Sequence, residues 1–465
     1  MKLLNLIFAI TPDFLFGIDN RLPWGSCKED MKFFSRTTSN TFNPPYVVMG
    51  RKTFESLPSK LEDRINVIIS SSISDLGGDL QFKSLHDFLL HIPDKSTAEI
   101  FIIGGKGLIE EALTIYRNII KNMYVSIINK EIVNGTEKVF LNINLSEYSE
   151  FLQSSVSKGE VVFNYYQFPE HPELQYLSLL HKTLSGDNRQ TRNAKTFSIF
   201  SERLSFDLSK GFPLLTTKKM FLRGIFEELL FFFRGQTDSK ILESKGVNIW
   251  KPNTTTEFIQ KCNLPYSEGD MGPLYGFNWK HFGAEYINCQ TDYSGKGYNQ
   301  LEGILDLLVN DPHSRRILLT DYNPAVAKQG VLYPCHSIII QFYVTEQGKK
   351  KKVSMNMYQR SVDEFLGLPF NIASNALFLH LLCSTLNVRT QSDSYEPGIL
   401  NIIMGDCHIY ESHLEAVKEQ LARIPLTFPK LVVHKPNIAL EAYDWKDVEI
   451  VNYNHHPAIK AEMIA

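Results

Sequence analysis

The polar residues around one cysteine have the chemistry of a nucleophilic site. Cys335 follows a proline and precedes His336, and two strand-like runs separate it from Arg360, Ser361 and Asp363. A nearby positive charge lowers the pKa of a thiol, and the resulting thiolate is a carbon nucleophile. Arginine and serine together can hold an anion such as phosphate. A buried cysteine in a β core is the simpler explanation for a lone cysteine, and these neighbours favour the nucleophile.

A carboxylate and a pair of glycines stand out in the first third of the chain. Asp30 precedes Met31, Phe33 and Phe34 in a helical pattern, and a carboxylate on an apolar face is costly unless it has a partner. A solvated aspartate at the rim of that face is the alternative. The pair Gly104-Gly105 ends a strand-like run and opens a helical one, where phosphate can approach the backbone. A plain tight turn explains the glycines equally well.

Alternating strand and helix patterns position these residues. Short apolar runs rich in Ile and Val alternate with helical patterns, which predicts a largely parallel α/β sheet. The predicted strands are 4–10, 46–49, 65–70, 99–103, 124–129 and 161–168, and the predicted helices are 27–36, 85–90 and 107–116. Beyond a short segment with two prolines, further helices are predicted at 174–183 and 221–233, and strands at 337–345 and 353–359.

Composition narrows the class of protein. The 465 residues suffice for two or three domains, and 43% hydrophobic with 21% charged residues suits a soluble globular fold. A net charge of -3 gives no global attraction to nucleic acid, and Lys349–Lys352 beside Gly348 predict a solvated hairpin turn. Six cysteines without metal or CxxC spacing predict a reducing compartment and no metal site. The run 3–10 predicts a buried strand rather than a signal peptide, so we expect a cytosolic enzyme.

Two further motifs in residues 1–168, 17–24 (GIDNRLPW) and 49–58 (MGRKTFESLP), resemble dihydrofolate reductase together with Asp30 and Gly104-Gly105. The resemblance implies that Asp30 binds the pteridine and promotes protonation at N5, that 17–24 form a mobile loop, and that Thr136 belongs to the hydrogen-bond network behind Asp30. The implied folate site is Ile7, Ala9, Asp30, Met31, Phe34, Ser56, Leu57, Arg64 and Thr136. The implied NADPH site is Ala9, Gly17, Ile18, Gly50, Arg51, Lys52, Thr53, Ser70, Ser71, Ser72, Ile103, Gly104, Gly105, Lys106 and Gly107.

This segment departs from the family pattern at three places. Ile109 stands where the family usually has a tyrosine near the nicotinamide. Lys106-Gly107 follow the glycine pair in place of small residues, and Glu137-Lys138 lengthen the loop after Thr136. None of these changes removes the acid or the phosphate contacts.

The cysteine motif, 358–363 (YQRSVD) and 366–373 (LGLPFNIA) resemble thymidylate synthase, and the resemblance covers the rest of the chain. It implies that Cys335 attacks C6 of dUMP, that Glu228 organises proton transfer at O4, and that Asn371 favours dUMP over dCMP. The implied catalytic residues are Cys335, Glu228, His336, Asn371, Tyr275 and Asp363. The implied dUMP site is Arg192, Arg315, Arg316, Arg360, Ser361, Asn371, His408 and Tyr410. The implied folate site is Trp250, Asn253, Asp363, Leu366, Gly367, Phe370 and Ala465.

The adjacent arginines Arg315 and Arg316 bear on assembly. Neighbouring side chains of a strand point to opposite faces, so the pair need not serve one ligand within one subunit. In the synthase family this pair reaches the phosphate site of the other subunit, which implies a homodimer with two composite sites. Arg192 matches its family counterpart only after a one-residue shortening.

Two departures concern the synthase segment. Lys251 replaces the aspartate that usually follows Trp250, although Asn253 keeps the nearby family asparagine. Four residues rather than three separate His336 from Gln341. A bulge in the strand is expected to absorb the extra residue.

These observations predict an α/β reductase-like domain at 1–168, a linker at 169–173 and an α+β synthase-like domain at 174–465. The expected enzyme methylates dUMP to dTMP with 5,10-methylenetetrahydrofolate and reduces the resulting dihydrofolate with NADPH. The alternatives are a synthase with an inactive reductase-like domain, a pyrimidine hydroxymethylase, and an RNA-binding regulator. Intact Asp30, Arg64 and Gly104-Gly105 argue against the first, and near-neutral charge without an aromatic-basic sheet motif argues against the last.

Overall fold

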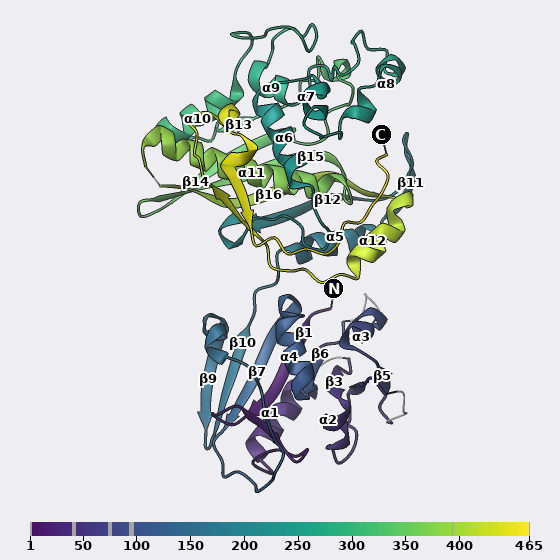
Figure 1. Cartoon of the computed structure of the whole chain (residues 1–465), viewed down its shortest axis with the longest axis vertical. Helices are drawn as coiled ribbons and strands as arrows, with labels where there is room; N and C mark the ends of the chain where they lie inside the picture. Colours follow the sequence, from purple (N-terminus) through teal and green to yellow (C-terminus); the bar gives the residue numbers. More distant parts are fainter. Residues whose placement is uncertain (1, 40–42, 73–76, 93–96, 393, 465) are drawn as a thin grey trace. The chain divides into compact units, whose positions relative to one another are not determined.

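The chain forms two compact units, Met1–His171 and Pro172–Ala465, in a computed structural model. The structure describes residues 2–39, 43–72, 77–92, 97–392 and 394–464. Each unit has its own sheet (Figure 1), so each is described by itself. In the part of the chain that is described, no helix has both the length and the apolar character needed to cross a membrane.

Unit 1 is built on an eight-stranded sheet of order β5-β4-β3-β6-β1-β7-β10-β9. Its strands are β1 (Leu4–Ile10), β3 (Tyr46–Gly50), β4 (Ile65–Ile69), β5 (Leu80–Phe82), β6 (Ile100–Gly104), β7 (Ile120–Ile128), β9 (Leu152–Lys158) and β10 (Val161–Gln167). Pairings among the first six are parallel, whereas β10 is antiparallel to β7 and β9. The predicted, mostly parallel α/β sheet is therefore confirmed.

Helices α1 (Lys28–Ser39), α2 (Arg51–Glu55), α3 (Leu85–His91) and α4 (Lys106–Thr114) connect these strands. A small ribbon of β2 (Leu15–Ile18) and β8 (Lys138–Phe140) lies outside the main sheet. The strand β9 was not predicted, because every one of its residues is exposed and the alternation of buried and exposed positions is missing.

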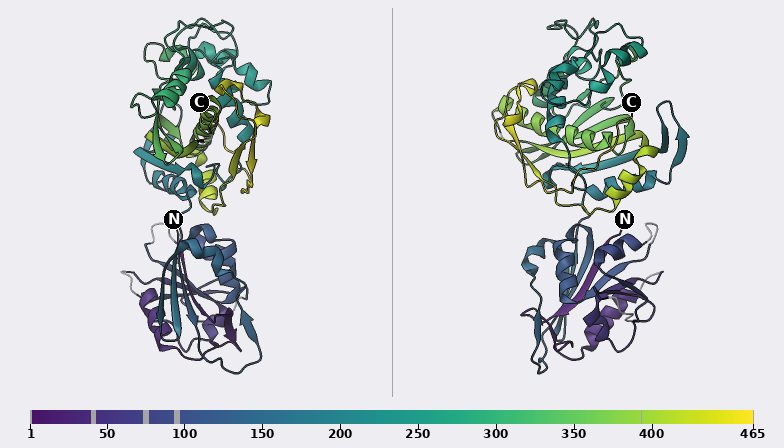
Figure 2. Two further views of the ribbon diagram at one scale, coloured as in Figure 1. Left: turned by 90° about the vertical axis from the view of Figure 1, so that its left-hand side faces the viewer. Right: turned by 45° about the vertical axis from the view of Figure 1, so that its right-hand side comes forward.

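Unit 2 contains a six-stranded sheet of order β11-β12-β16-β15-β14-β13. Its strands are β11 (Asp187–Gln190), β12 (Lys195–Asp207), β13 (Leu318–Leu319), β14 (Ile339–Gln347), β15 (Lys350–Asp363) and β16 (Tyr395–Tyr410). The long, mostly buried helix α11 (Gly367–Thr390) packs against β15 and β16 (Figures 1 and 2). The other main helices are α5 (Glu173–Thr183), α6 (Leu222–Phe233), α9 (Gly276–His281), α10 (Gln300–Asn310) and α12 (Leu414–Leu421).

The hairpin between β14 and β15 confirms one prediction and corrects another. The strands join through Gly348, which has a φ of 62°, beside the run Lys349–Lys352. The predicted bulge is wrong, since the ladder from Ile339↔Tyr358 to Gln347↔Lys350 has no register shift. The chain instead turns at Ser337, whose φ of 55° is left-handed, before the ladder begins.

Candidate active sites

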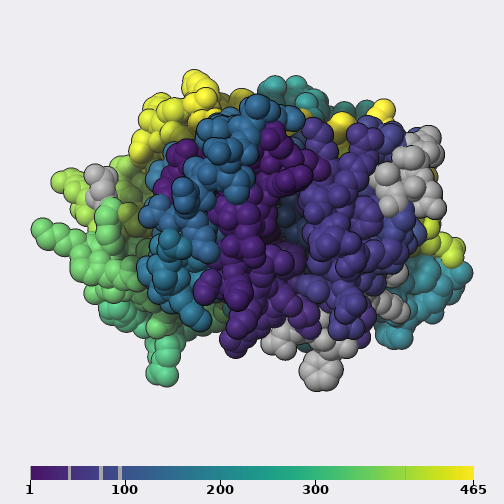
Figure 3. All heavy atoms as spheres, turned by 90° about the horizontal axis from the view of Figure 1, so that it is seen from below, coloured from purple at the N-terminus to yellow at the C-terminus, as the bar shows by residue number. Residues whose placement is uncertain are grey.

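Unit 1 contains a cavity of about 1350 Å³ that gathers most of the residues predicted for folate and NADPH. Figure 3 shows a hollow in this unit between atoms drawn in purple and in indigo. The predicted residues that line the cavity are Ile7, Ala9, Gly17, Ile18, Asp30, Met31, Phe34, Gly50, Arg51, Lys52, Thr53, Ser56, Leu57, Ser70, Ser71, Ser72, Ile103, Gly105, Lys106 and Gly107. Arg64, Gly104 and Thr136 are not part of this lining. Glu111, which the sequence analysis did not predict, does line the cavity.

Asp30 is the carboxylate of this cavity and lies in the first turn of α1. Its exposed fraction is 8%, and burial raises its pKa, while a hydrogen bond with the Ser126 hydroxyl lowers it. A carboxyl group with a raised pKa keeps its proton to a higher pH than a solvated aspartate does. The alternative of a solvated aspartate at the rim of the helix is thereby excluded.

The structure corrects the assignment of Thr136. Its hydroxyl and backbone N–H donate to the carboxylate of Asp19, at 3.3 and 3.2 Å, and Thr136 is exposed. The hydroxyl beside Asp30 comes from Ser126 on β7. Ser126 lies two residues after Tyr124, and alternate residues of a strand share a face. This spacing was the sequence signal that could have identified Ser126.

The residues predicted for the NADPH phosphates include glycines and cations. Gly104 has a φ of 155°, and a Cβ built on it would lie 3.0 Å from Thr53 Oγ1. Glycine at 104 therefore makes room for the Thr53 side chain and adopts a φ that other residues rarely take. Arg51, Lys52 and Lys106 line the same cavity and supply positive charge. Arg64 donates to Thr38 Oγ1 on α1 at 2.9 Å, outside the lining.

In unit 2, the thiol of Cys335 lies 3.6 Å from the hydroxyl of Tyr275. Tyr275 is the N-cap of α9, and its ring stacks on His336 at 4.3 Å between centroids. Arg360 donates from Nε to the carbonyl of Pro334 at 3.1 Å, and its own backbone N–H donates to the carbonyl of Cys335. The structure thus brings the predicted nucleophile, Tyr275, His336 and Arg360 together.

The protonation of Cys335 differs from the sequence expectation. Burial raises the pKa of this thiol, and the charge of Asp321 raises it further, whereas Tyr275 and Arg360 lower it. The expected thiolate beside Arg360 is therefore not the favoured form in the free chain, because desolvation outweighs the arginine. Burial also lowers the pKa of His336 to about 4, which leaves its imidazole neutral.

Glu228 and Asp363 are held by specific donors. The indole of Trp250 donates to Glu228 Oε1 at 2.8 Å, and burial raises the pKa of this carboxyl to about 7. Asp363 accepts from the backbone of Phe365 and Leu366 at 2.8 and 3.2 Å, just before α11. Both carboxyl groups are consequently fixed, one poised to carry a proton near neutral pH and the other oriented by backbone amides.

The ends of two parallel strands bring the nucleoside residues together. Asp363 pairs with His408 in the ladder of β15 and β16, and Ser361 pairs with Asp406. His408 shares a hydrogen bond of 3.0 Å with Asp406, and its ring meets Tyr410 edge-on at 5.1 Å. Asp406, which sequence reasoning missed as a site residue, fixes the orientation of His408.

The remaining folate residues surround the start of α11 and the η4 turn (Lys251–Asn253). Asn253 has an exposed fraction of 3%, and its buried Nδ2 has no partner among the described residues, so it is a ready donor. Lys251 points to Glu243 in an exposed ion pair of 3.5 Å. Leu366 is the N-cap of α11, which begins at Gly367 and contains Phe370 and Asn371. The prediction for Ala465 lies outside the described residues.

The arginines predicted for phosphate lie on different elements of unit 2. Arg192 lies in the turn between β11 and β12, where it donates to Asn193 Oδ1 at 3.0 Å. Arg315 and Arg316 are exposed just before β13, and within the described ranges their side chains have no hydrogen bond or ion pair. Arg360 and Ser361, by contrast, donate their backbone N–H groups to the carbonyl of Cys335.

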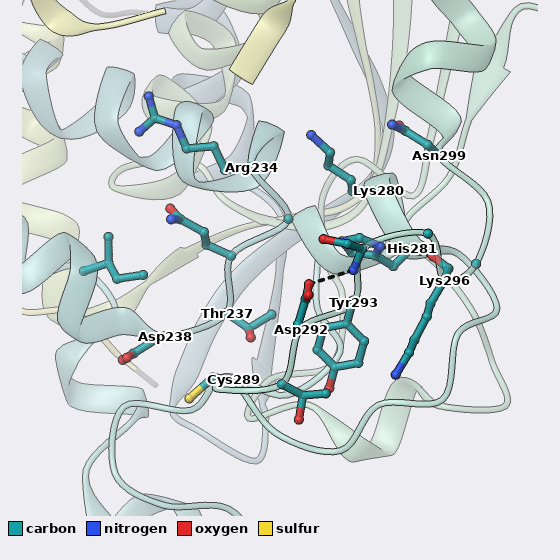
Figure 4. A pocket seen from close by; sticks show the side chains of 17 residues that line it. Arg234, Thr237, Asp238, Lys280, His281, Cys289, Asp292, Tyr293, Lys296 and Asn299 are labelled. Carbon is teal, nitrogen blue, oxygen red and sulfur yellow. Dashed lines mark hydrogen bonds between the residues drawn. The ribbon is translucent and has the colours of Figure 1, made fainter. Parts of the chain in front are cut away.

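Unit 2 also contains a hollow of about 630 Å³ (Figure 4). None of the predicted site residues lines this hollow. Its basic side chains already have partners. Arg234 donates to the carbonyls of Glu441 and Tyr443, at 3.0 and 2.8 Å, and Lys280 is paired with the Glu441 carboxylate at 2.6 Å. Among the residues described in either unit, no group of His, Cys, Asp and Glu could hold a metal ion.

Comparison with known proteins assigns a family to each unit. Residues 3–170 match the family model of dihydrofolate reductase, and residues 174–465 match that of thymidylate synthase. The first unit is thus a member of the reductase family and the second a member of the synthase family.

Curated relatives carry both units in one chain. The bifunctional dihydrofolate reductase-thymidylate synthase of Paramecium tetraurelia is 39% identical over 480 residues, which cover 99% of each chain. Those of Zea mays and Leishmania major are 33% and 32% identical, covering 99% and 100% of this chain and 96% and 95% of theirs. The chain belongs to the family of bifunctional dihydrofolate reductase-thymidylate synthases, which supports dTMP synthesis and dihydrofolate reduction.

Proposed function

We propose that Cys335 is the nucleophile of the synthase and adds to C6 of dUMP. Its contact with Tyr275 at 3.6 Å, beside Arg360, is the observation that carries this assignment. Glu228, held by Trp250, moves protons at the pyrimidine O4, and Asn371 on α11 binds the pyrimidine edge. Arg360 and Ser361 hold the phosphate, and His408 and Tyr410 hold the ribose. The one-carbon unit comes from methylenetetrahydrofolate, a cosubstrate bound by Trp250, Asn253, Asp363, Leu366, Gly367, Phe370 and Ala465.

In the reductase, Asp30 binds the pteridine and promotes protonation at N5 of dihydrofolate. The cofactor assignment is supported by a lining that fits a phosphorylated dinucleotide: cations at Arg51, Lys52 and Lys106, hydroxyls at Ser70–Ser72, and the glycine Gly105. NADPH, when bound, supplies the hydride. The aromatic and aliphatic wall around Asp30, including Phe34 and Leu57, excludes water from the reacting edge and keeps the pKa of Asp30 raised.

The synthase unit acts as a homodimer. The outer face of its sheet exposes apolar side chains at Leu318, Ile339, Tyr343 and Tyr358, with exposed fractions between 37% and 69%. Ile339 and Tyr358 are directly opposed in the ladder, so these side chains form a continuous patch. Monomeric proteins seldom leave such a patch uncovered, and a second copy is its occupant.

Dimerisation also explains the unpartnered arginines. Arg316 lies two residues before Leu318 in the chain, and Arg360 lies two residues after Tyr358 on β15, so Arg360 shares the sheet face that the patch occupies. Arg315 and Arg316 then bind the phosphate held in the neighbouring subunit. Sedimentation of the purified chain at micromolar concentration tests the dimer, and a monomer would contradict it.

The chain operates in a reducing, cytosolic compartment. All six cysteines are free, and three of them, Cys27, Cys383 and Cys407, are buried. Free thiols in this number are typical of compartments where glutathione keeps them reduced.

One assay tests both activities together. The purified chain receives dUMP and methylenetetrahydrofolate, and dihydrofolate formation is followed with and without NADPH. Product analysis that found hydroxymethylated pyrimidine would replace the synthase assignment. Accumulation of dihydrofolate despite NADPH would indicate that the reductase unit is only structural.

A further inference from the structure

An exposed tyrosine stands directly before the segment that carries the nucleophile. Tyr333 precedes Pro334 and Cys335, its exposed fraction is 43%, and it belongs to none of the sites assigned above. An aromatic ring beside a nucleophile either covers the surface or holds a neighbouring group. The contacts of Tyr333 distinguish these two roles.

The guanidinium of Arg360 lies over this ring, with its Cζ 5.4 Å from the ring centroid of Tyr333. A cation over an aromatic face is attracted by the quadrupole of the ring. Arg360 Nε also donates to the carbonyl of Pro334 at 3.1 Å, and its backbone N–H donates to the carbonyl of Cys335 at 2.8 Å. Three consecutive residues, 333–335, thus hold one arginine beside the nucleophile.

These contacts leave the anion-binding edge of Arg360 unused. The residue is exposed, and among the described residues its Nη1 and Nη2 groups have no hydrogen bond or ion pair. The N–H groups of a guanidinium lie in its plane, whereas its face packs on aromatic rings. The ring of Tyr333 can therefore fix the plane of the guanidinium without occupying a donor. Both Nη groups remain for the oxygens of a phosphate.

A second tyrosine fixes the ring. The hydroxyls of Tyr322 and Tyr333 share a hydrogen bond of 2.9 Å, and the two ring centroids are 5.9 Å apart. The backbone N–H of Tyr322 donates to Thr320 Oγ1 at 3.1 Å, and the Thr320 hydroxyl donates to the carbonyl of Ile338. The ring of Tyr333 is consequently held by a residue that is itself anchored to the chain beyond Cys335.

We propose that Tyr333 is a positioning residue for substrate recognition, which orients the guanidinium of Arg360 toward the phosphate of dUMP, while Tyr322 fixes the ring. This inference rests on the proposed role of Arg360 in holding that phosphate. Because the ring acts through Arg360, it should matter for the nucleotide and not for the same nucleoside without its phosphate. The expected consequence is a change in affinity rather than in the chemical step.

The test compares dUMP with deoxyuridine, which lacks the phosphate, on the full chain. Tyr333→Leu should weaken the binding of dUMP, measured by calorimetry, roughly two- to fivefold, the range for an exposed cation–π contact. The KM for dUMP should rise by a similar factor with kcat nearly unchanged. Inhibition of dTMP formation by deoxyuridine should stay the same. Unchanged dUMP binding, or equal weakening of both ligands, would overturn the proposal.

A double variant shows whether the tyrosine acts through the arginine. In an Arg360→Ala background, Tyr333→Leu should have no further effect on dUMP binding, and a full additional effect would overturn the proposal. If Arg360→Ala itself leaves the preference for dUMP over deoxyuridine unchanged, the phosphate role of Arg360 fails and the inference fails with it. If Arg360→Ala abolishes that preference and Tyr333→Leu leaves it intact, only the inference fails.

Three further variants make the result specific. Tyr333→Phe keeps the ring and should bind dUMP more tightly than Tyr333→Leu does, so an equal loss in both would overturn the proposal. Tyr333→Gln replaces the leucine variant if thermal melting shows that the latter does not fold. Tyr298→Leu makes the same substitution at another exposed tyrosine, just before α10, and should bind dUMP as the unmodified chain does.

Discussion

Trp250 donates its indole N–H to Oε1 of Glu228 at 2.8 Å, and this bond distinguishes two adjacent glutamates. The neighbour, Glu227, is paired with Lys245 at 2.6 Å instead. Both stand on α6, but successive residues of a helix face different directions. Glu227 therefore has its charge balanced by a cation, whereas Glu228 is desolvated against a neutral donor and keeps a pKa of about 7.

Glu228→Gln should lower the rate of dTMP formation by roughly two to four orders of magnitude, because the amide cannot carry the proton. It should also change the pH dependence of stability. The pKa of Glu228 is raised from 4.5 to about 7 in the folded chain, so its contribution to stability is present below the lower value and lost as pH rises through the higher one. Thermal melts between these values should depend less steeply on pH in the variant. Glu227→Gln is the matched control, and an equal loss of synthase activity there would contradict the assignment.

Ser126→Ala should move the pH profile of the reductase. The Ser126 hydroxyl lowers the pKa of Asp30, so its removal raises that pKa further. The alkaline limb of the profile, where Asp30 loses its proton, should shift to higher pH. Thr136→Ala is the control, because Thr136 bonds Asp19 instead, and its profile should match that of the unmodified chain. A shift in Thr136→Ala without one in Ser126→Ala would reinstate the sequence-based assignment.

The two activities should separate by single substitutions. Asp30→Asn should lower NADPH-dependent reduction of dihydrofolate by roughly two to four orders of magnitude and leave dTMP formation unchanged. Cys335→Ser should abolish dTMP formation and leave the reductase near normal, because a hydroxyl is a far weaker nucleophile than a thiolate. Residual dTMP formation at more than a small fraction of the normal rate would show that Cys335 is not the nucleophile.

The sequence predicts site residues correctly where the interacting residues are close together in the chain or belong to one motif. Cys335 and His336 are adjacent, and Arg360 lies at the end of a recognisable strand, so the motif itself places them at one site. Ser126 and Asp30 are distant in the sequence, and only the packing of α1 on β7 brings them together. For that reason the sequence analysis chose Thr136, a loop residue, as the hydroxyl beside Asp30 in place of Ser126.

Other features needed the fold itself. The structure has a left-handed residue at Ser337 and no bulge in the ladder that follows, and no pattern in 335–341 distinguishes these two possibilities. In the sequence, Asp321 looks like an ordinary loop aspartate. The burial of its side chain and the lack of a hydrogen-bond partner for its carboxyl oxygens among the described residues depend on residues that are distant in the chain, so only the fold reveals them. The protonation state of the Cys335 thiol also depends on how completely the fold excludes water from it. The presence of Arg360 in the sequence does not reveal the extent of this burial.

The composite synthase site can be tested by mixing subunits. Arg316→Ala should impair the phosphate site of the neighbouring subunit, and Cys335→Ser inactivates the site in its own. In a heterodimer of the two variants, one site carries both defects and the other carries neither. Two nearly inactive parents should therefore regain activity on subunit exchange, up to about half of the normal rate per heterodimer if the sites act independently.

The exchange experiment needs two checks. Each parent alone must be strongly impaired, and if Arg316→Ala is not, Arg315→Ala takes its place. Native mass spectrometry must show the heterodimer. If heterodimers form and no activity returns, Arg315 and Arg316 serve their own subunit, and the exposed patch at Ile339 and Tyr358 would join two chains whose sites are each complete.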